Sequence, residues 1–222
     1  MNRHDLGETV ILLHGLGSGP GQLALLARRL RRAGYRVVSP GYPSTKEPLE
    51  RLVAWLEGMV EDCERDGAAR IHFVTHSLGG IIVRAYLAER DRPFDGRVVM
   101  LAPPNRGSEL VDAFHKSPLL TKLLGPVGSR LGTDPDSIPS SLPPADFEVG
   151  VITGTRSINP VGSHLIPGPN DGSVSVERAR LEGAGAFKVV PGTHTFLMNR
   201  TDVAGDVIRF LEQGRFEADL GL

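Results

Sequence analysis

Cysteine is almost missing from this chain, since Cys63 is the only one among its 222 residues. A single cysteine can form neither an intramolecular disulfide nor a cysteine-based zinc cluster, so the fold must be stable without either. Cys63 falls within a run of apolar residues at helical spacing. We therefore expect it to be an inert, partly buried thiol.

An excess of charge of either sign is also absent, because 25 basic residues face 26 acidic ones for a net charge of -1. No basic stripe or acidic tail stands out, which argues against a nucleic acid as partner. No apolar run is long enough to cross a membrane, and the polar first eight residues lack the apolar core of a signal peptide. The sequence predicts a cytoplasmic protein with no integral membrane segment, and it indicates no oligomeric state.

The chain does contain an alternation of strand and helix patterns. With 222 residues and 40% apolar content it can form one sizeable core, so we expect a single domain over residues 1–222. Short apolar runs typical of strands occur at 8–15, 36–39, 71–76, 97–102, 147–153 and 186–190. Helical spacing of apolar residues occurs at 23–33, 49–60, 78–89 and 201–213. This alternation predicts an α/β fold with a mostly parallel sheet of about six strands and helices on both faces.

Two further expectations concern element ends and the middle of the chain. The last helix should have Thr201 as its N-cap and Gly214 as its end.

The stretch 105–146 is rich in proline and less regular. We interpret it as a small cap within the single domain.

The stretch 71–83 has the layout of a strand, a sharp turn and a helix, with Ser77 at the turn. This is the context of a nucleophile elbow, in which the turn strains the serine and lifts its hydroxyl off the end of the sheet. Gly79 fits a position crowded against a strand, and Gly80 lets the helix approach the sheet. The usual motif is G-x-S-x-G, and Thr75 replaces its first glycine. The elbow must therefore open slightly, or the Thr75 side chain must find a pocket. The alternative is that Ser77 only caps the helix.

A serine nucleophile needs a base, and the base needs an acceptor that holds one tautomer. His194 follows the last expected strand, and Asp171 lies in Asn170-Asp171-Gly172 between the last two strands. The order Ser77, Asp171, His194 is the one expected for such a sheet. The alternative reading of Asn-Asp-Gly is a plain turn. His76 adjoins the nucleophile, but its side chain should point away from the Ser77 hydroxyl. The reserve carboxylates are Asp134, Asp136, Asp146 and Glu177.

Two backbone amides could form an oxyanion hole, that of Leu78 after the serine and that of Leu16 in the glycine loop after the first strand. A phosphate cradle is the alternative for this loop. Gly15, Gly17 and Gly19 break the G-x-G-x-x-G spacing of a dinucleotide site, and no acidic residue follows the next strand. The sequence therefore favours the oxyanion loop.

With these residues in hand, the chain resembles the α/β-hydrolase superfamily, and within it the small bacterial lipases and esterases. The resemblance covers about residues 8–210. It is carried by His14-Gly15, by Thr75 to Gly80, by the segment Ala102 to Leu110 and by Asn170-Asp171-Gly172. It implies an α/β-hydrolase fold without the first two strands of larger members, and it supports Asp171 as the catalytic aspartate that orients His194. It also implies acyl-ester hydrolysis without a cofactor. Some bacterial lipases hold a structural calcium, but we find no convincing carboxylate cluster for a metal.

The combined expectation is a serine carboxylesterase that uses Ser77, His194 and Asp171 on a small-molecule ester. The short cap favours short- to medium-chain acyl groups. The same triad could serve a triacylglycerol lipase, a thioesterase, an acyltransferase or a peptidase, because the pocket chooses the substrate. A non-catalytic binding protein of the same fold is the other alternative. The candidates for an acyl pocket are Phe114, Phe196 and the leucines of the cap, which are Leu119, Leu120, Leu123 and Leu124. These side chains could equally only cover the sheet.

Overall fold

The computed structural model describes residues 7–217 of the chain. Residues 1–6, on which the expectation of a cytoplasmic location partly rests, lie outside the described part. Among the residues that are described, no helix has both the length and the apolar character needed to cross a membrane.

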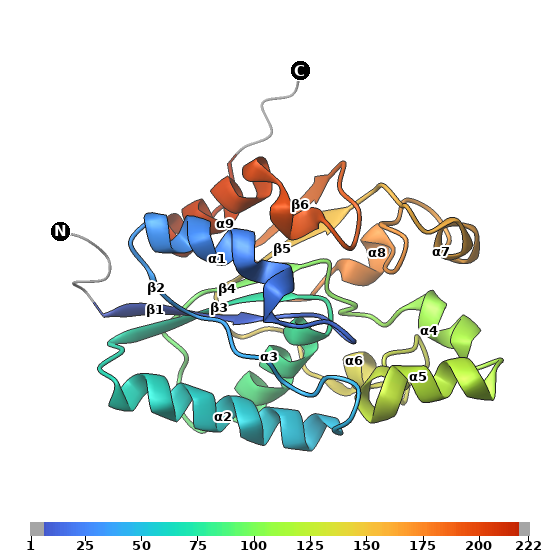
Figure 1. Cartoon of the computed structure of the whole chain (residues 1–222), viewed down its shortest axis with the longest axis horizontal. Coiled ribbons are helices and arrows are strands. Elements are labelled where there is room, and N and C mark those ends of the chain that lie inside the picture. Colours follow the sequence, from blue (N-terminus) through green and yellow to red (C-terminus); the bar gives the residue numbers. More distant parts are fainter. Residues whose placement is uncertain (1–6, 218–222) are drawn as a thin grey trace.

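The centre of the fold is a six-stranded sheet with the strand order β2-β1-β3-β4-β5-β6 (Figure 1). All of its neighbouring strands are parallel, which confirms the predicted sheet. Four of the strands (β1, β3, β4 and β5) are buried almost throughout, as their continuous apolar runs indicate. The strands are β1 Glu8–Leu13, β2 Arg36–Val38, β3 Arg70–His76, β4 Val98–Leu101, β5 Val149–Gly154 and β6 Ala186–Val190.

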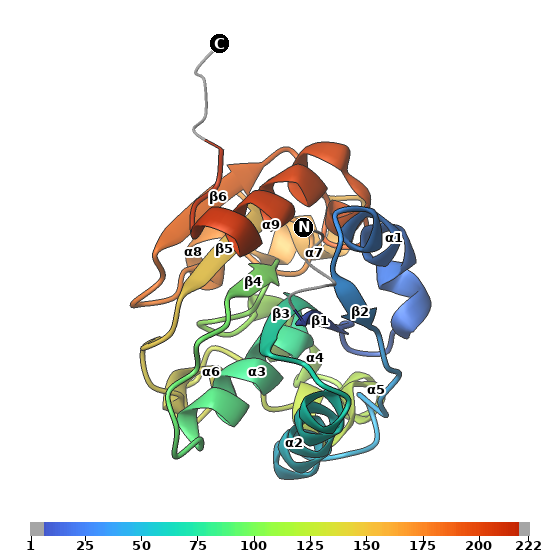
Figure 2. The same ribbon diagram turned by 90° about the vertical axis from the view of Figure 1, so that its left-hand side faces the viewer.

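Helices cover both faces of the sheet. Figure 2 shows α1 (Ala24–Arg32) and α9 (Thr201–Gln213) on one face, with α2 (Leu49–Arg65) and α3 (Leu78–Ala88) on the other. Each face has its own apolar core, one including Leu26 and Val207, the other including Leu56 and Ile82. The sheet is therefore buried on both sides, and only its ends can carry a site that faces solvent.

The stretch 105–146 is more regular than expected, because it contains α4 (Glu109–Phe114), α5 (Pro118–Gly128) and α6 (Ile138–Ser141). The buried Arg84 of α3 joins the two ends of this stretch by donating to the carbonyls of Asn105 (2.9 Å) and Leu142 (3.2 Å). Burial lowers the pKa of Arg84 to about 10. In Figure 1, α4 and α5 lie beyond the carboxyl ends of the strands. The division into a domain and a cap stays a prediction.

Four short elements complete the described chain. They are η2 Pro20–Leu23, α7 Pro160–Leu165, α8 Val176–Ala179 and η3 Leu197–Asn199.

The ends of α9 and the state of Cys63 refine the sequence expectations. Thr201 is the first residue of α9, and Arg200 holds the N-cap position instead. In the first turn of α9, the Asp202 carboxylate accepts from the Val203 amide and forms an ion pair with Arg200. Gly214 ends α9 in the left-handed conformation, as predicted. Cys63 is buried, and burial raises the pKa of its thiol.

Candidate active site

Ser77 occupies the turn between β3 and α3, with φ 50° and ψ −119°. A residue with a side chain rarely adopts a positive φ, and such strain is typical of functional positions. Ser77 stands at the N-cap position of α3, but its side chain makes no capping hydrogen bond. Helix capping therefore does not account for the serine.

The glycines around Ser77 are required by close approaches. A Cβ on Gly79 would lie 2.7 Å from the Leu13 carbonyl oxygen of β1, so α3 starts directly against the neighbouring strand. A Cβ on Gly80 would lie 3.3 Å from the Thr75 hydroxyl, whose residue is wholly buried. The space that Gly80 leaves thus accommodates the branched side chain that replaces the usual first glycine.

Asp171 and His194 are joined by a hydrogen bond of 2.8 Å between the carboxylate Oδ2 and the ring Nδ1. The other carboxylate oxygen accepts from the amides of Ser173 (3.0 Å) and Val174 (2.8 Å). The Asp171 side chain is 0% exposed, and the His194 amide also donates to the Asp171 carbonyl at 3.1 Å. Because Asp171 holds the Nδ1 hydrogen, the Nε2 lone pair of His194 is left to accept a proton. The carboxylate bonded to His194 is therefore Asp171 and none of the reserve residues Asp134, Asp136, Asp146 and Glu177.

Ser77 and His194 border one cavity of about 380 Å³ at the carboxyl ends of β1 and β3. Among the described residues, no hydrogen bond joins the Ser77 hydroxyl to the His194 ring in this structure. Catalytic hydrogen bonds are often long before substrate binds, so the shared cavity is the relevant relationship. The site lies beside β1, whose neighbours in the sheet are β2 on one side and β3 on the other. The order in which the chain adds strands therefore changes direction at β1. This is the switch point at which parallel sheets bind ligands.

The apolar wall of this cavity comes mainly from the 105–146 stretch, and Phe114 is one of its lining residues. Three of the other candidates do not line it, since Leu119, Leu123 and Phe196 are 69%, 65% and 53% exposed. Leu119 and Leu123 are four residues apart on α5 and share its outer face, whereas Leu124 faces inward. Leu124, one of the cap leucines considered from the sequence, does line the cavity, and so does Leu16 of the loop after β1. Sequence reasoning missed the following lining residues: Leu110, Val111, Leu131 and Val174.

The loop after β1 is held close to Ser77. A Cβ on Gly15 would lie 3.3 Å from the Ser77 Cβ, and the Gly15 amide donates to the Gln22 side chain at 3.2 Å. The Gly17 amide donates to the Ser44 hydroxyl at 3.0 Å. Within residues 7–217, the amides of Leu16 and Leu78 donate to no protein acceptor. Both are thus available to a ligand, while the amides on either side of Leu16 are used to shape the loop.

The His14 side chain holds the start of the loop after β1 in place. Its ring stacks on Tyr42 with centroids 4.1 Å apart, its Nδ1 donates to the Gly15 carbonyl at 2.9 Å, and its Nε2 accepts from the Tyr42 amide at 3.4 Å. The Tyr42 hydroxyl donates to the His14 carbonyl, and burial raises the pKa of Tyr42. Burial lowers the pKa of His14, so its ring stays neutral. Gln22, Tyr42 and Ser44 gave no signal in the sequence, because these contacts are made only by folding.

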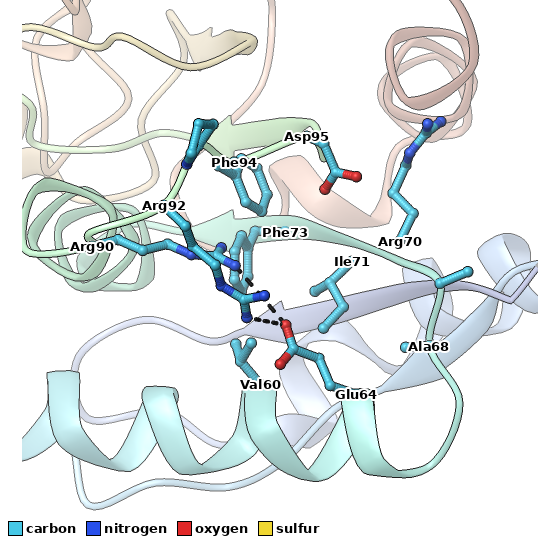
Figure 3. A pocket seen from close by; sticks show the side chains of 12 residues that line it. Val60, Glu64, Ala68, Arg70, Ile71, Phe73, Arg90, Arg92, Phe94 and Asp95 are labelled. Carbon is cyan, nitrogen blue, oxygen red and sulfur yellow. Dashed lines mark hydrogen bonds and ion pairs between the residues drawn. The ribbon is translucent and has the colours of Figure 1, made fainter.

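A second cavity of about 270 Å³ lies at the opposite end of β3, against the C-terminal part of α2 (Figure 3). Figure 3 shows Arg90 and Arg92 converging on Glu64, which forms an ion pair with each of them. Two of the three arginines that line this cavity, Arg90 and Arg92, therefore share a single carboxylate. The cavity also lies at the amino end of the strand, away from the turn that carries Ser77.

Comparison with known proteins agrees with this architecture. The sequence matches the alpha/beta hydrolase family over residues 10–191. A search of curated protein sequences finds no match.

Among solved structures, the chain resembles the lipase BlEst2 of Bacillus licheniformis. The propeptide form is 19% identical with a TM-score of 0.74, over 95% of this chain and 50% of that one, so this chain spans about half of its length. The mature form is 17% identical with a TM-score of 0.72, over 94% and 92% of the two chains.

Phospholipase PlaB from Legionella pneumophila is 18% identical with a TM-score of 0.62, over 94% of this chain and 60% of that one. At these identities the solved structures show a shared fold alone. The family match, however, spans most of the chain. This chain belongs to the alpha/beta hydrolase family.

Proposed function

We propose that this protein is a serine carboxylesterase that cleaves short- to medium-chain acyl esters. The observation that carries the proposal is the 2.8 Å bond between Asp171 and His194, made at the rim of the cavity that also exposes Ser77. A buried carboxylate, an oriented imidazole and a strained serine are the three groups that acyl transfer needs.

In the proposed reaction, the Ser77 Oγ attacks the ester carbonyl carbon while His194 Nε2 takes the hydroxyl proton. The negative charge that develops on the carbonyl oxygen is held by the amides of Leu16 and Leu78. Asp171 keeps the ring in position and stabilises the imidazolium. The alcohol then leaves with the proton from His194, and an acyl group remains on Ser77. Water, activated by His194, releases the acid and restores the serine.

The cavity supports the preference for small acyl groups. Its volume of about 380 Å³ is near the lower end of the roughly 300–1,000 Å³ typical of ligand pockets. Leu110, Val111, Phe114 and Leu131 give it an apolar wall suited to an alkyl chain. No cofactor takes part in the proposed chemistry, and the partner is a small-molecule ester.

The test is a series of p-nitrophenyl esters from acetate to palmitate, with a fluorophosphonate probe beside it. We expect turnover to peak at short to medium chains and the probe to label Ser77 covalently. Ser77→Ala should lose both labelling and turnover, while circular dichroism shows an intact fold. Unchanged turnover in Ser77→Ala, or a wild-type chain that the probe does not label, would contradict the proposal. Thioesters run in parallel would reveal a thioesterase if they react much faster than the matching esters.

A further inference from the structure

Three side chains that take no part in the proposed reaction meet on the outer side of the 105–146 stretch. Asp112 lies on α4, and His115 follows three residues later at its C-cap, so both share one helical face. Asp134 comes from the loop that follows α5. One possible ligand atom from each of the three residues lies within 4.8 Å of those of the other two. Separate segments therefore bring one imidazole and two carboxylates together.

The surroundings of His115 leave one ring nitrogen available. Its Nε2 donates to the Ser129 carbonyl at 2.7 Å. In a neutral ring with a hydrogen on Nε2, the lone pair is on Nδ1. Metal-binding histidines commonly donate their second nitrogen to a backbone carbonyl in this way, because that bond fixes the tautomer and the ring orientation.

Asp112 is oriented in a similar manner. One carboxylate oxygen accepts from the Thr133 amide at 2.9 Å, and the other accepts from the Thr133 hydroxyl at 2.6 Å. Each carboxylate oxygen has two lone pairs, so a ligand position remains on Asp112 after both bonds are made.

Space for an ion is present beside these groups. His115 and Asp134 line a cavity of about 340 Å³, and Gly132 belongs to the same wall. A Cβ on Gly132 would lie 2.5 Å from the Asp112 carboxylate oxygen and 3.7 Å from the His115 ring. A side chain at position 132 would thus displace the Asp112 carboxylate, whereas the His115 ring would be at an ordinary contact distance.

We propose that Asp112, His115 and Asp134 form a zinc site, in which His115 Nδ1 and one oxygen of each carboxylate bind the ion and water completes a tetrahedron. One imidazole with two carboxylates is a donor set that suits Zn²⁺, whereas Ca²⁺ and Mg²⁺ select oxygen ligands. The two carboxylates supply the two negative charges that balance the ion.

Such an ion would join α4 to the loop after α5. Val111 and Phe114 on α4 and Leu131 in that loop line the cavity that contains Ser77. The zinc site would thus brace the wall of that cavity from outside, at a distance from the serine. It does not depend on the proposed esterase activity.

The experiment is calorimetric titration of the metal-stripped protein with zinc chloride, compared with three variants. His115→Gln and Asp134→Asn each remove one ligand at an exposed position, so both should fold normally, as circular dichroism can verify. Asp136→Asn is the matched control, since Asp136 lines the same cavity but is outside the three-residue cluster. We expect one equivalent of zinc in the wild type and in Asp136→Asn. Each ligand variant should bind at least about tenfold more weakly.

A second readout separates this site from zinc held elsewhere. Zinc should raise the melting temperature of the wild type, of Asp136→Asn and of His194→Ala, but not that of His115→Gln or Asp134→Asn. The proposal is overturned if the wild type binds no equivalent of zinc. It is equally overturned if both ligand variants bind like the wild type, or if only His194→Ala loses the ion.

Discussion

The imidazole of His76 lies against that of His194, with ring centroids 4.7 Å apart, and its Nε2 donates to the His194 carbonyl at 3.0 Å. His76 precedes the nucleophile in sequence, and on its other side a Cβ on Gly15 would lie 2.7 Å from its Nδ1. One buried ring thus separates the loop after β1 from the loop that carries the proposed base. Burial, followed by repulsion from His194, holds the pKa of His76 well below its ordinary value. The ring is therefore a neutral spacer.

Removing the His76 donor should weaken the placement of His194. His76→Leu loses one hydrogen bond worth about 1 kcal/mol, so we expect kcat to fall by about five- to tenfold while KM changes little. His76→Gln retains an N–H group and should recover most of the rate. Steady-state kinetics on a butyrate ester measure both, and the exposed His164→Gln serves as control. A His76→Leu enzyme with wild-type kcat would show that the contact is not used.

Asp171→Asn should preserve the loop but replace the hydrogen-bond acceptor that faces His194 Nδ1 with a hydrogen-bond donor. The amide oxygen can still accept from Ser173 and Val174, whereas its NH₂ group cannot accept the Nδ1 hydrogen. In a serine protease the same change lowers kcat by about 10⁴, and a loss of that order is expected here. The rate of fluorophosphonate labelling should fall in parallel. Asp146→Asn, at an exposed reserve position, should label at the wild-type rate. Labelling of Asp171→Asn within tenfold of wild type would assign the orienting role to another group.

Stability should decrease as the pH falls through the range of the buried histidines. The pKa values of His76 and His14 are both lowered from 6.5 by burial, so the folded state binds fewer protons than the unfolded state below that pH. Their contribution is complete above pH 6.5 and is lost as the pH falls, by up to about 1.4 kcal/mol per unit for each ring. Urea unfolding at pH 7.5 and 5.5 measures this loss. His76→Gln should show a smaller difference between the two pH values, and an equal difference would contradict the assignment.

Two glycine-to-alanine changes should have opposite effects on the free energy of unfolding. Gly205 lies in α9 with open space around it, so Gly205→Ala should stabilise the protein by up to about 1 kcal/mol through helix propensity. Gly79→Ala has the same propensity gain in α3, but its Cβ would meet Leu13 at 2.7 Å. We expect it to destabilise the fold by about 1–3 kcal/mol and to lower activity, because it displaces α3 from β1. Equal stabilisation by both changes would contradict the close approach of Gly79 to the Leu13 carbonyl.

The cavity wall can be tested by chain length. Phe114→Ala should enlarge the cavity and shift the preferred p-nitrophenyl ester toward longer acyl chains. The exposed Leu119→Ala should leave the profile as it is, because Leu119 does not line the cavity. If only Leu119→Ala changed the preferred chain length, Leu119 would contact the acyl chain, as predicted from the sequence, and Phe114 would not.

The features that the sequence predicted are those encoded locally. Apolar runs of strand length and apolar spacing of helical period gave the six parallel strands and the covering helices, because burial on both faces imposes those patterns. Ser77 was recognisable because a strand, a strained turn and a helix follow one another within 13 residues of sequence. Asp171 and His194 were selected by their order along the chain, by their positions after strands and, for Asp171, by the resemblance to lipases, so their pairing remained a hypothesis.

Folding decided whatever depends on residues far apart in the chain. The bond between Asp171 and His194, the neutral ring of His76 beside them and the cluster of Asp112, His115 and Asp134 each join segments whose separation carries no periodic signal. The direction of the α5 leucines was also decided by packing, since Leu119 and Leu124 look alike in sequence and differ only in which side of the helix meets the core. The sequence by itself therefore determined the parallel sheet and its serine turn, and the tertiary structure alone determined which side chains complete the site.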